Sequence, residues 1–306
     1  MKWEDFRQSD NIEDRRGSDY AGAGGGGFMG GGSSGHLGLG AMIVLGIIGY
    51  ALGIDPRVLI GGAEMVSHRS PNQGYQQGQG YQQSAPQGKA GAPKDRIGQF
   101  VAAILAENED VWKEVLPQQA HIRFIPAPMV LFNGQTRSGC GRAQAQMGPF
   151  YCPEDKKIYL DTSFFREMQQ KFGGGGDFAY AYVISHEMGH HIQDLLGILP
   201  KMQAAQQNAS STEQANAISV RIELQADCLA GVWAANANQK WQVIEPGDVE
   251  KAIRTAQAIG DDKLQEASRG YAVPDSFTHG SAAQRVQWLQ RGLQSGKIAA
   301  CNTFAQ

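Results

Sequence analysis

Residues 178–193 read FAYAYVISHEMGHHIQ, and this stretch decides how the rest of the chain is interpreted. Its apolar first half predicts a buried helix that continues through His186, Glu187 and His190. On a helix, His186 and His190 lie at positions i and i+4 and share one face. Two imidazoles placed in this way can bind one zinc ion at about 2.0–2.1 Å each. Glu187 lies beside that face, where a carboxylate can take a proton from the attacking water.

The two histidines have an alternative interpretation as core residues with ordinary hydrogen-bond partners, because a buried imidazole needs some partner. His191 follows directly, but it points about 100° away around the helix. We therefore expect His191 to contact neighbouring residues or solvent rather than the same metal ion. Tyr180 and Tyr182, which lie upstream on this helix, are expected to be core aromatic residues.

A third metal ligand has to come from another part of the chain. In the metzincin pattern a third histidine would stand where this chain has Leu196, so that class is excluded. Downstream, Glu223 and Asp227 lie at i and i+4 within a helical pattern that spans 211–236. One carboxylate can bind zinc while its neighbour accepts a hydrogen bond from a histidine's free N–H. A solvent-exposed helix charge is the alternative for Glu223.

Three motifs resemble those of the bacterial neutral zinc metallopeptidase family, the YpfJ-like group. They are HEMGHHIQ at 186–193, ELQADCLAG at 223–231 and THGSAAQR at 278–285. The opening MKWEDFRQSDNIEDRRG also resembles that family, so the resemblance covers essentially the whole chain. More distantly, the three motifs are similar to those of the membrane CAAX-processing and heat-shock metalloproteases.

The resemblance implies a role for each matching residue. Glu223 would be the third zinc ligand, and Asp227 would orient a ligand histidine. His279 would stabilise the oxyanion of the reaction, and Arg285 would be structural. For His279 there is a second interpretation, in which it caps the following helix or binds a backbone carbonyl.

The globular region predicts a mainly helical α+β domain with a few short strands, which the resemblance identifies as a zincin-like metallopeptidase domain. Asp95 is expected to cap a first helix. The stretch Ile122–Phe132 reads as an extended edge strand because it contains Pro126 and Pro128. Lys157–Asp161 is expected to be a short strand. Further helices are expected at 162–172, at 178–196 with Asp177 as its cap, and at 211–236, 246–259 and 281–293.

Four segments are predicted along the chain. Residues 1–36 are polar and then rich in glycine, and 37–54 form an uncharged apolar run. Eighteen helical residues span about 27 Å, close to the thickness of a bilayer core. A buried core helix is the alternative for this run, but its five glycines would destabilise a soluble helix. Residues 55–93 read as a flexible Gln/Gly/Pro-rich linker, and 94–306 as the zinc metallopeptidase domain.

The apolar run therefore predicts a single transmembrane anchor. Basic residues before the run favour a cytoplasmic N-terminal segment. The catalytic domain would then lie on the periplasmic, or extracytoplasmic, side of a bacterial inner membrane. Cys140 and Cys152 fit this location, because a disulfide between them would close a small loop and contribute about 3 kcal/mol. Cys228 and Cys301 are expected either to pair or to be free core thiols.

Composition limits the remaining function classes. The 306 residues are 42% hydrophobic, so the chain can bury a core, and 27 Lys and Arg balance 30 Asp and Glu. This balance argues against a nucleic-acid binder that depends on a basic surface. We expect a membrane-anchored zinc metallopeptidase that acts on proteins or peptides. The alternatives are a catalytically idle metal-stabilised scaffold, which would not need Glu187, and a zinc amidase that acts on cell-wall peptides.

Overall fold

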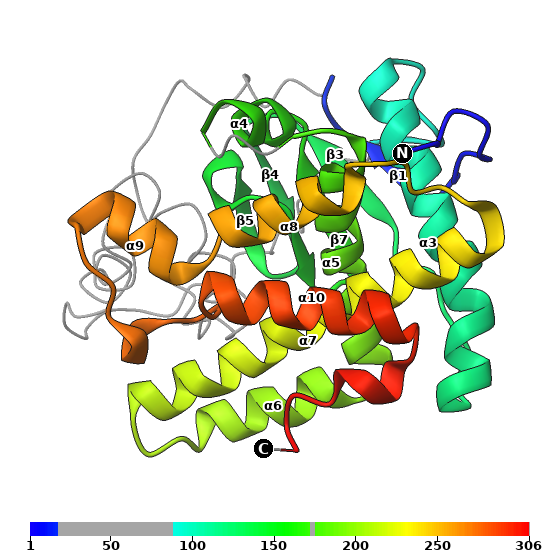
Figure 1. Cartoon of the computed structure of the whole chain (residues 1–306). Helices are drawn as coiled ribbons and strands as arrows, with labels where there is room; N and C mark the ends of the chain where they lie inside the picture. The colour runs from blue at the N-terminus through cyan, green and yellow to red at the C-terminus, as the bar shows by residue number, and fades with distance from the viewer. Residues whose placement is uncertain (18–87, 172–174, 306) are drawn as a thin grey trace, which may run out of the picture.

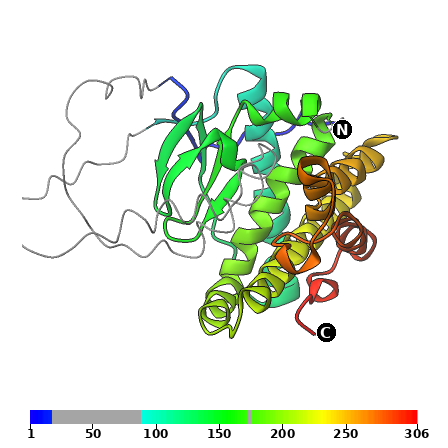
Figure 2. The same ribbon diagram turned by 90° about the vertical axis from the view of Figure 1, so that its left-hand side faces the viewer.

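A computed structural model describes residues 1–17, 88–171 and 175–305 (Figure 1). One mixed sheet has the strand order β2-β1-β3-β7-β6. Figure 2 shows this sheet on one side of the molecule and the C-terminal helices on the other. The predicted mainly helical α+β architecture is confirmed. The strands are β1 Ile12–Asp14, β2 Lys89–Ala90, β3 Met129–Phe132, β6 Phe150–Cys152 and β7 Lys157–Asp161, and β4 Gln135–Ser138 and β5 Gly141–Gln144 form a separate hairpin.

Strand β3 corrects one expectation from the sequence. It was predicted as part of an edge strand, but it lies in the middle of the sheet and pairs in parallel with both β1 and β7. All four of its residues are buried. Pro126 and Pro128 lie before the strand, which begins at Met129, so the missing proline N–H groups do not interrupt its hydrogen bonds. The predicted strand Lys157–Asp161 is confirmed as β7.

The first seventeen residues belong to the folded domain, which corrects the predicted separate N-terminal segment 1–36. β1 pairs with β3 and with β2, so the domain also includes residues before the predicted boundary at 94. Trp3 is buried, packs edge-on against Phe100 at 5.3 Å, and donates its indole N–H to Asp177. The polar composition of this segment concealed these contacts, because its charged residues pair with the domain; Arg7, for example, binds Glu109 and Asp110.

This packing has a consequence for membrane topology. Since residues 1–17 pack on the body formed by 88–171 and 175–305, all of these residues lie on the same side of any membrane. A single crossing between them would separate β1 from β3, so the combination of a cytoplasmic N-terminal segment with an extracytoplasmic domain is incompatible with this fold. The predicted anchor at 37–54 lies outside the described residues. No helix within the described ranges has the length and apolar character that a membrane crossing requires.

Two long helices, α5 and α7, form the centre of the helical layer, and α5 lies between the sheet and α7 (Figures 1 and 2). The predicted helices are all present, but α6 and α9 were not expected. Asp95 caps α3 as predicted, whereas α5 begins after Gly176 and has no side-chain cap. The helices are α3 Arg96–Ala120, α4 Phe164–Lys171, α5 Asp177–Leu195, α6 Ile198–Gln207, α7 Thr212–Trp241, α8 Asp248–Ala258, α9 Asp261–Arg269 and α10 Ala282–Ser295, with short 3-10 helices η2 Ala145–Met147, η3 Pro274–Ser276 and η4 Ile298–Cys301.

Two disulfides connect distant parts of this fold. Cys140, at the turn between β4 and β5, is bonded to Cys152 at the end of β6, which confirms the predicted bridge. Cys228 of α7 is bonded to Cys301 of η4, which decides between the two alternatives left by the sequence. The second bridge closes a separation of 73 residues. A loop of this size corresponds to about 4 kcal/mol of stabilisation in the chain-entropy account.

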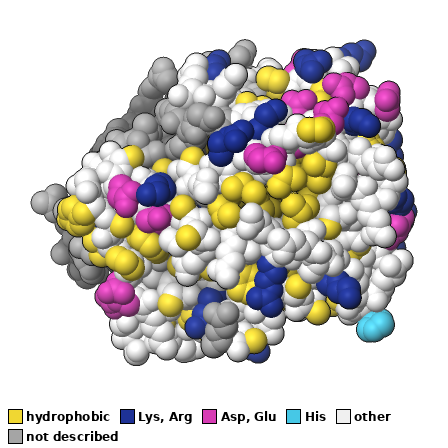
Figure 3. All heavy atoms as spheres, in the orientation of Figure 1, with side chains coloured by type: hydrophobic (Ala, Val, Ile, Leu, Met, Phe, Trp, Pro, Cys, Tyr) yellow, Lys and Arg dark blue, Asp and Glu magenta, His cyan; other side chains and the backbone are white. Residues whose placement is uncertain are grey.

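On the face of the molecule that Figure 3 shows, Lys and Arg side chains are interspersed with Asp and Glu side chains. No large patch of one sign is visible on that face. The mixture agrees with the near balance of charges in the sequence.

Helices α7 and α10 approach each other at two glycines. A Cβ atom at Gly292 would overlap the backbone carbonyl of Cys228, and one at Gly231 would overlap the backbone of Leu289. Both helices therefore depend on residues that lack a side chain at this contact. The packing energy gained by this close approach outweighs the roughly 1 kcal/mol of helix stability that a glycine costs in a helix interior.

We predict that Gly292→Ala lowers the free energy of unfolding by about 1–3 kcal/mol, because the added methyl group forces the two backbones apart. Urea unfolding followed by circular dichroism measures the change. Gln294→Ala is the matched control, since Gln294 is exposed on the same helix. A Gly292→Ala variant as stable as the control would show that the contact is looser than described.

Candidate metal centre

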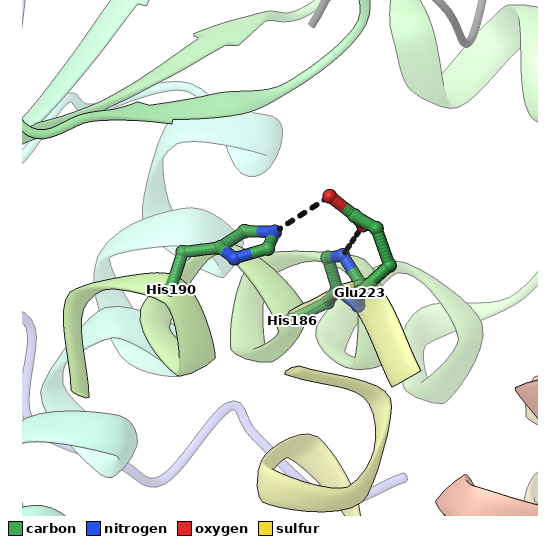
Figure 4. Close-up of side chains that lie close together, drawn as sticks. All are labelled: His186, His190 and Glu223. Carbon is green, nitrogen blue, oxygen red and sulfur yellow. Dashed lines mark hydrogen bonds and ion pairs between the residues drawn. The ribbon is translucent and has the colours of Figure 1, made fainter. Parts of the chain in front are cut away.

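Helices α5 and α7 bring together the three predicted metal ligands. His186 and His190 lie one turn apart on α5, and Glu223 faces them from α7 (Figure 4). His186 Nε2 lies 3.1 Å from Glu223 Oε2, and His190 Nε2 lies 3.5 Å from Glu223 Oε1. One donor atom from each residue lies within 4.8 Å of the others, and all three residues are buried. Glu223 is therefore not the solvent-exposed helix charge that the sequence allowed.

The approach of α7 to α5 depends on the glycine inside the HEMGH motif. A Cβ atom at Gly189 would lie 3.0 Å from the carbonyl oxygen of Ala226, which is tighter than ordinary side-chain contacts. A glycine at this position lets the α7 backbone pack directly on α5. The Glu223 carboxylate, one turn before Ala226, can then reach both imidazoles.

A buried network fixes the orientation of His186. Its Nδ1 atom lies 2.9 Å from Asp227 Oδ1, so the ring donates a hydrogen bond there and its Nε2 atom faces Glu223. Arg285 donates to both oxygens of Asp227 at 2.9 Å, and the Tyr182 hydroxyl donates to Oδ1 at 2.6 Å. The structure thus places Asp227 and Arg285 where the resemblance implied, with Asp227 on the histidine and Arg285 behind it.

His190 has a different orienting partner, which the sequence reasoning missed. Its Nδ1 atom lies 2.9 Å from Gln193 Oε1, and the Gln193 amide in turn donates to the carbonyl oxygen of Ile222 at 2.7 Å. Gln193 is completely buried. A sequence signal existed, since Gln193 lies three residues after His190 on the same helix, where side chains meet.

The acidic groups make this centre favourable for positive charge. Burial opposes a charged imidazole, but Asp227 and Glu223 outweigh it and raise the pKa of His186 to about 10. Burial likewise opposes the charge of Glu223, but the two histidines hold its pKa well below the usual value. For Asp227, burial is outweighed by Arg285 and His186, which lower its pKa to about 2. A cation bound between the imidazoles and Glu223 would find these carboxylates already ionised.

The residues fit a zinc ion on structural grounds. Glu223 Oε1 is buried and has no hydrogen-bond partner among the described residues, which is costly for a carboxylate oxygen. A metal ion between the three donors would satisfy that oxygen. Two imidazoles and one carboxylate form a donor set that zinc uses in catalytic sites, and both imidazoles have the hydrogen-bond partner at Nδ1 that such ligands need.

Glu187 is buried beside the cluster. Burial raises its pKa, against the opposing effect of His190, His186 and a backbone hydrogen bond from Tyr151. Tyr151 belongs to β6, the edge strand of the sheet. The cluster therefore lies between that strand and α7, with the carboxylate of Glu187 facing the strand.

His279 lies on the segment between η3 and α10 and is 1% exposed. Its Nδ1 atom lies 3.2 Å from Asp261 Oδ1, while its Nε2 atom is buried and without a hydrogen-bond partner in the described structure. The helix cap is Ser281, whose hydroxyl accepts from the backbone of Gln284, so the capping interpretation of His279 is wrong.

His191 makes contacts away from the cluster, as expected. It is buried, its Nε2 atom donates to the carbonyl oxygen of Ile125 at 2.6 Å, and its Nδ1 atom lies 3.1 Å from the Tyr151 hydroxyl. Burial lowers its pKa. Tyr180 packs on Phe165, and Tyr182 is a core residue whose hydroxyl belongs to the Asp227 network.

Comparisons with known proteins agree with the motifs. The family described as "Putative neutral zinc metallopeptidase" matches residues 1–304. The "Uncharacterized protein YpfJ" of Escherichia coli strain K12 is 45% identical over 306 residues, which cover 100% of this chain and 99% of that protein. The "Uncharacterized protein Rv2575" of Mycobacterium tuberculosis is 42% identical over 230 residues, 71% of this chain and 74% of that protein. No solved structure matches the chain.

We predict that Arg285→Met lowers the free energy of unfolding by about 3–5 kcal/mol, because it leaves the buried carboxylate of Asp227 without its cation. Urea unfolding of the metal-free protein isolates this effect from metal binding. Arg291→Met is the control, since Arg291 is exposed on the same helix and should change stability by less than about 1 kcal/mol. Equal stability of the two variants would contradict a structural role for Arg285.

Proposed function

Because the chain belongs to this neutral zinc metallopeptidase family, we propose that it hydrolyses peptide bonds in proteins or peptides with water activated at one zinc ion. The observation that carries the proposal is the convergence of His186, His190 and Glu223 on one point, with the carboxylate of Glu187 beside them. A purely structural zinc site is usually closed by four protein ligands and needs no neighbouring carboxylate. The three described donors would leave a position for water or substrate.

His186, His190 and Glu223 would hold the ion, which when bound supplies a Lewis acid that polarises the scissile carbonyl and activates water. Glu187 accepts the proton of the attacking water on its carboxylate and later delivers it to the leaving nitrogen. Its raised pKa suits this exchange, since a base works best when its pKa lies nearer the working pH. His279 donates a hydrogen bond from Nε2 to the carbonyl oxygen as negative charge develops there.

Asp227 and Gln193 hold the two imidazoles in place during this reaction. Each accepts a hydrogen bond from an Nδ1 atom, and each is itself held by other buried groups. Such partners keep the ligand rings oriented, and their loss typically costs metal affinity or activity 10–100-fold.

We also propose that the folded domain works on the extracytoplasmic side of a bacterial inner membrane. The two disulfides support this location, because such bridges persist in oxidising compartments. Membrane association through 37–54 is part of the proposal. Since residues 1–17 pack on the same body as 88–305, the chain has to enter and leave the membrane on that one side.

We predict that Glu223→Ala loses the zinc ion, whereas Glu187→Gln retains one zinc per chain and loses peptidase activity. Glu223 is a proposed ligand, but Glu187 acts only on the proton. Metal analysis of the purified chain, together with cleavage of a peptide library, measures both properties. Glu213→Ala is the control, since Glu213 is exposed on the same helix as Glu223. Full zinc content in Glu223→Ala would remove Glu223 from the ligand set.

The topology is tested with single exposed cysteines. We predict that Gln8→Cys and Lys201→Cys are both labelled by a membrane-impermeant maleimide added to intact spheroplasts, because both residues are exposed on one extracytoplasmic body. Labelling after lysis gives the total for each variant. A single crossing would leave Gln8→Cys protected while Lys201→Cys reacts, and a cytoplasmic domain would protect both.

A further inference from the structure

Asp261, the first residue of α9, holds the segment that carries His279. Its Oδ2 atom accepts three consecutive backbone N–H groups, those of Thr278 at 2.7 Å, His279 at 2.6 Å and Gly280 at 3.1 Å. The backbone N–H of Asp261 also donates to the carbonyl oxygen of Gly280 at 2.9 Å. One carboxylate thus fixes the backbone on both sides of His279.

The second oxygen of Asp261 is directed at the imidazole itself. His279 Nδ1 lies 3.2 Å from Asp261 Oδ1, and both residues are less than a tenth exposed. The Thr278 hydroxyl oxygen lies 3.0 Å from the same nitrogen and can also accept from it. An ionised carboxylate can only accept, so a proton on Nδ1 is the arrangement that pairs with Asp261. The other ring nitrogen, Nε2, is buried without a partner in the part of the chain that the structure describes.

The charge of the His279 imidazole is coupled to the carboxylates around it, including that of Glu223. Asp261 and Glu223 both favour a positive charge on His279, and Arg285 opposes it. Burial also opposes that charge, but the two carboxylates outweigh it and raise the pKa of His279. The effect is mutual, since His279 contributes to the lowered pKa of Glu223. Geometry places the segment beside the same helix, since a Cβ atom at Gly280 would lie 3.2 Å from Leu224 and 3.3 Å from Val220, both on α7 next to the turn that carries Glu223.

We propose that Asp261 is the positioning residue for His279 and holds its imidazole in the doubly protonated form. In that form Nδ1–H donates to Asp261, and Nε2–H remains free to donate to the oxygen that becomes negative. A neutral ring held by Asp261 at Nδ1 has only a lone pair at Nε2, so it cannot donate. This inference rests on the proposed peptidase function and adds a residue that neither the motifs nor the family resemblance assigned.

The substitution Asp261→Asn separates positioning from folding. The asparagine oxygen can still accept the backbone N–H groups, while its amide donates toward Nδ1 and moves the ring proton to Nε2. We expect kcat to fall by roughly 10-fold or more, because a neutral imidazole donates more weakly than a charged one. Zinc content should be unchanged. We expect the wild type to lose activity at high pH, where His279 loses its proton, and we expect Asp261→Asn to lack that loss.

The control is Asp262→Asn. Asp262 is the next residue of α9, and its carboxylate accepts the backbone N–H of Ala282 at 2.7 Å without contacting His279. A merely structural role for this helix end predicts that both variants lower the melting temperature and leave kcat and its pH profile intact. That result for Asp261→Asn would overturn the proposal.

A double-mutant cycle tests whether Asp261 acts through the imidazole. In the His279→Gln background, Asp261→Asn should lower kcat by less than about 2-fold further, because the residue it positions is already absent. Additive losses would show that Asp261 acts independently of His279 and would contradict the proposal.

Nitrogen NMR of the zinc-loaded wild type tests the same proposal without any variant at Asp261. The His279 ring is assigned by its disappearance in His279→Gln, and we expect both ring nitrogens to be protonated near neutral pH. An unprotonated Nδ1 would overturn the proposal even if the chain cleaves peptides. Conversely, two protonated ring nitrogens in a chain that cleaves no peptide would support the proposed role of Asp261 toward His279 and would contradict the proposed peptidase function.

Discussion

The carboxylate of Asp227 joins three helices at one buried point, and the rest of the structure depends on that contact. It receives hydrogen bonds from His186 on α5 and Arg285 on α10, while Asp227 itself belongs to α7. A buried charge is tolerated only when its partners are well placed, because desolvation costs several kcal/mol per ion. The same pairing that satisfies the core therefore also orients a metal-ligand candidate. The contacts that hold the three helices together are therefore the same contacts that orient His186 in the candidate metal centre.

Close backbone packing makes this arrangement possible. Gly189 lets α7 lie against α5, and Gly231 and Gly292 let α10 lie against α7. Larger residues at these positions would widen the gaps that Glu223 and Arg285 have to cross. Each glycine lowers the intrinsic stability of its helix. The close packing that the glycines allow brings Glu223 and Arg285 within reach of their polar partners, which offsets this cost. The three candidate metal ligands lie on rigid helices rather than on loops. His279 lies on a loop, and a carboxylate at a helix end holds it there.

The sheet is stabilised by contacts between residues that are far apart in the sequence. β1 inserts beside β3 although more than 110 residues separate them, and the bond from Cys140 to Cys152 fixes the β4–β5 turn to β6. β6 is also the strand whose backbone contacts Glu187. The edge of the sheet that faces the Glu187 carboxylate is thus supported by a covalent link, which fits the oxidising compartment proposed for the domain.

The sequence by itself determined the local features of this protein. The i, i+4 spacing placed His186 and His190 on one face, the helix that carries Glu223 and Asp227 was visible in its apolar pattern, and the run Lys157–Asp161 was identified as a strand. These features depend on neighbours within a few residues, so periodicity is sufficient to find them. The three-part resemblance added Glu223, His279 and Arg285. Only the tertiary structure decided that β3 is central, that Cys228 pairs with Cys301, and that Gln193 and Asp261 hold the two imidazoles His190 and His279. The central place of β3, the Cys228–Cys301 bond and the Asp261 contact join residues far apart in the chain, and Gln193 is itself fixed from α7. Their geometry exists only after the intervening loops have closed, and no local pattern encodes which distant partner is met.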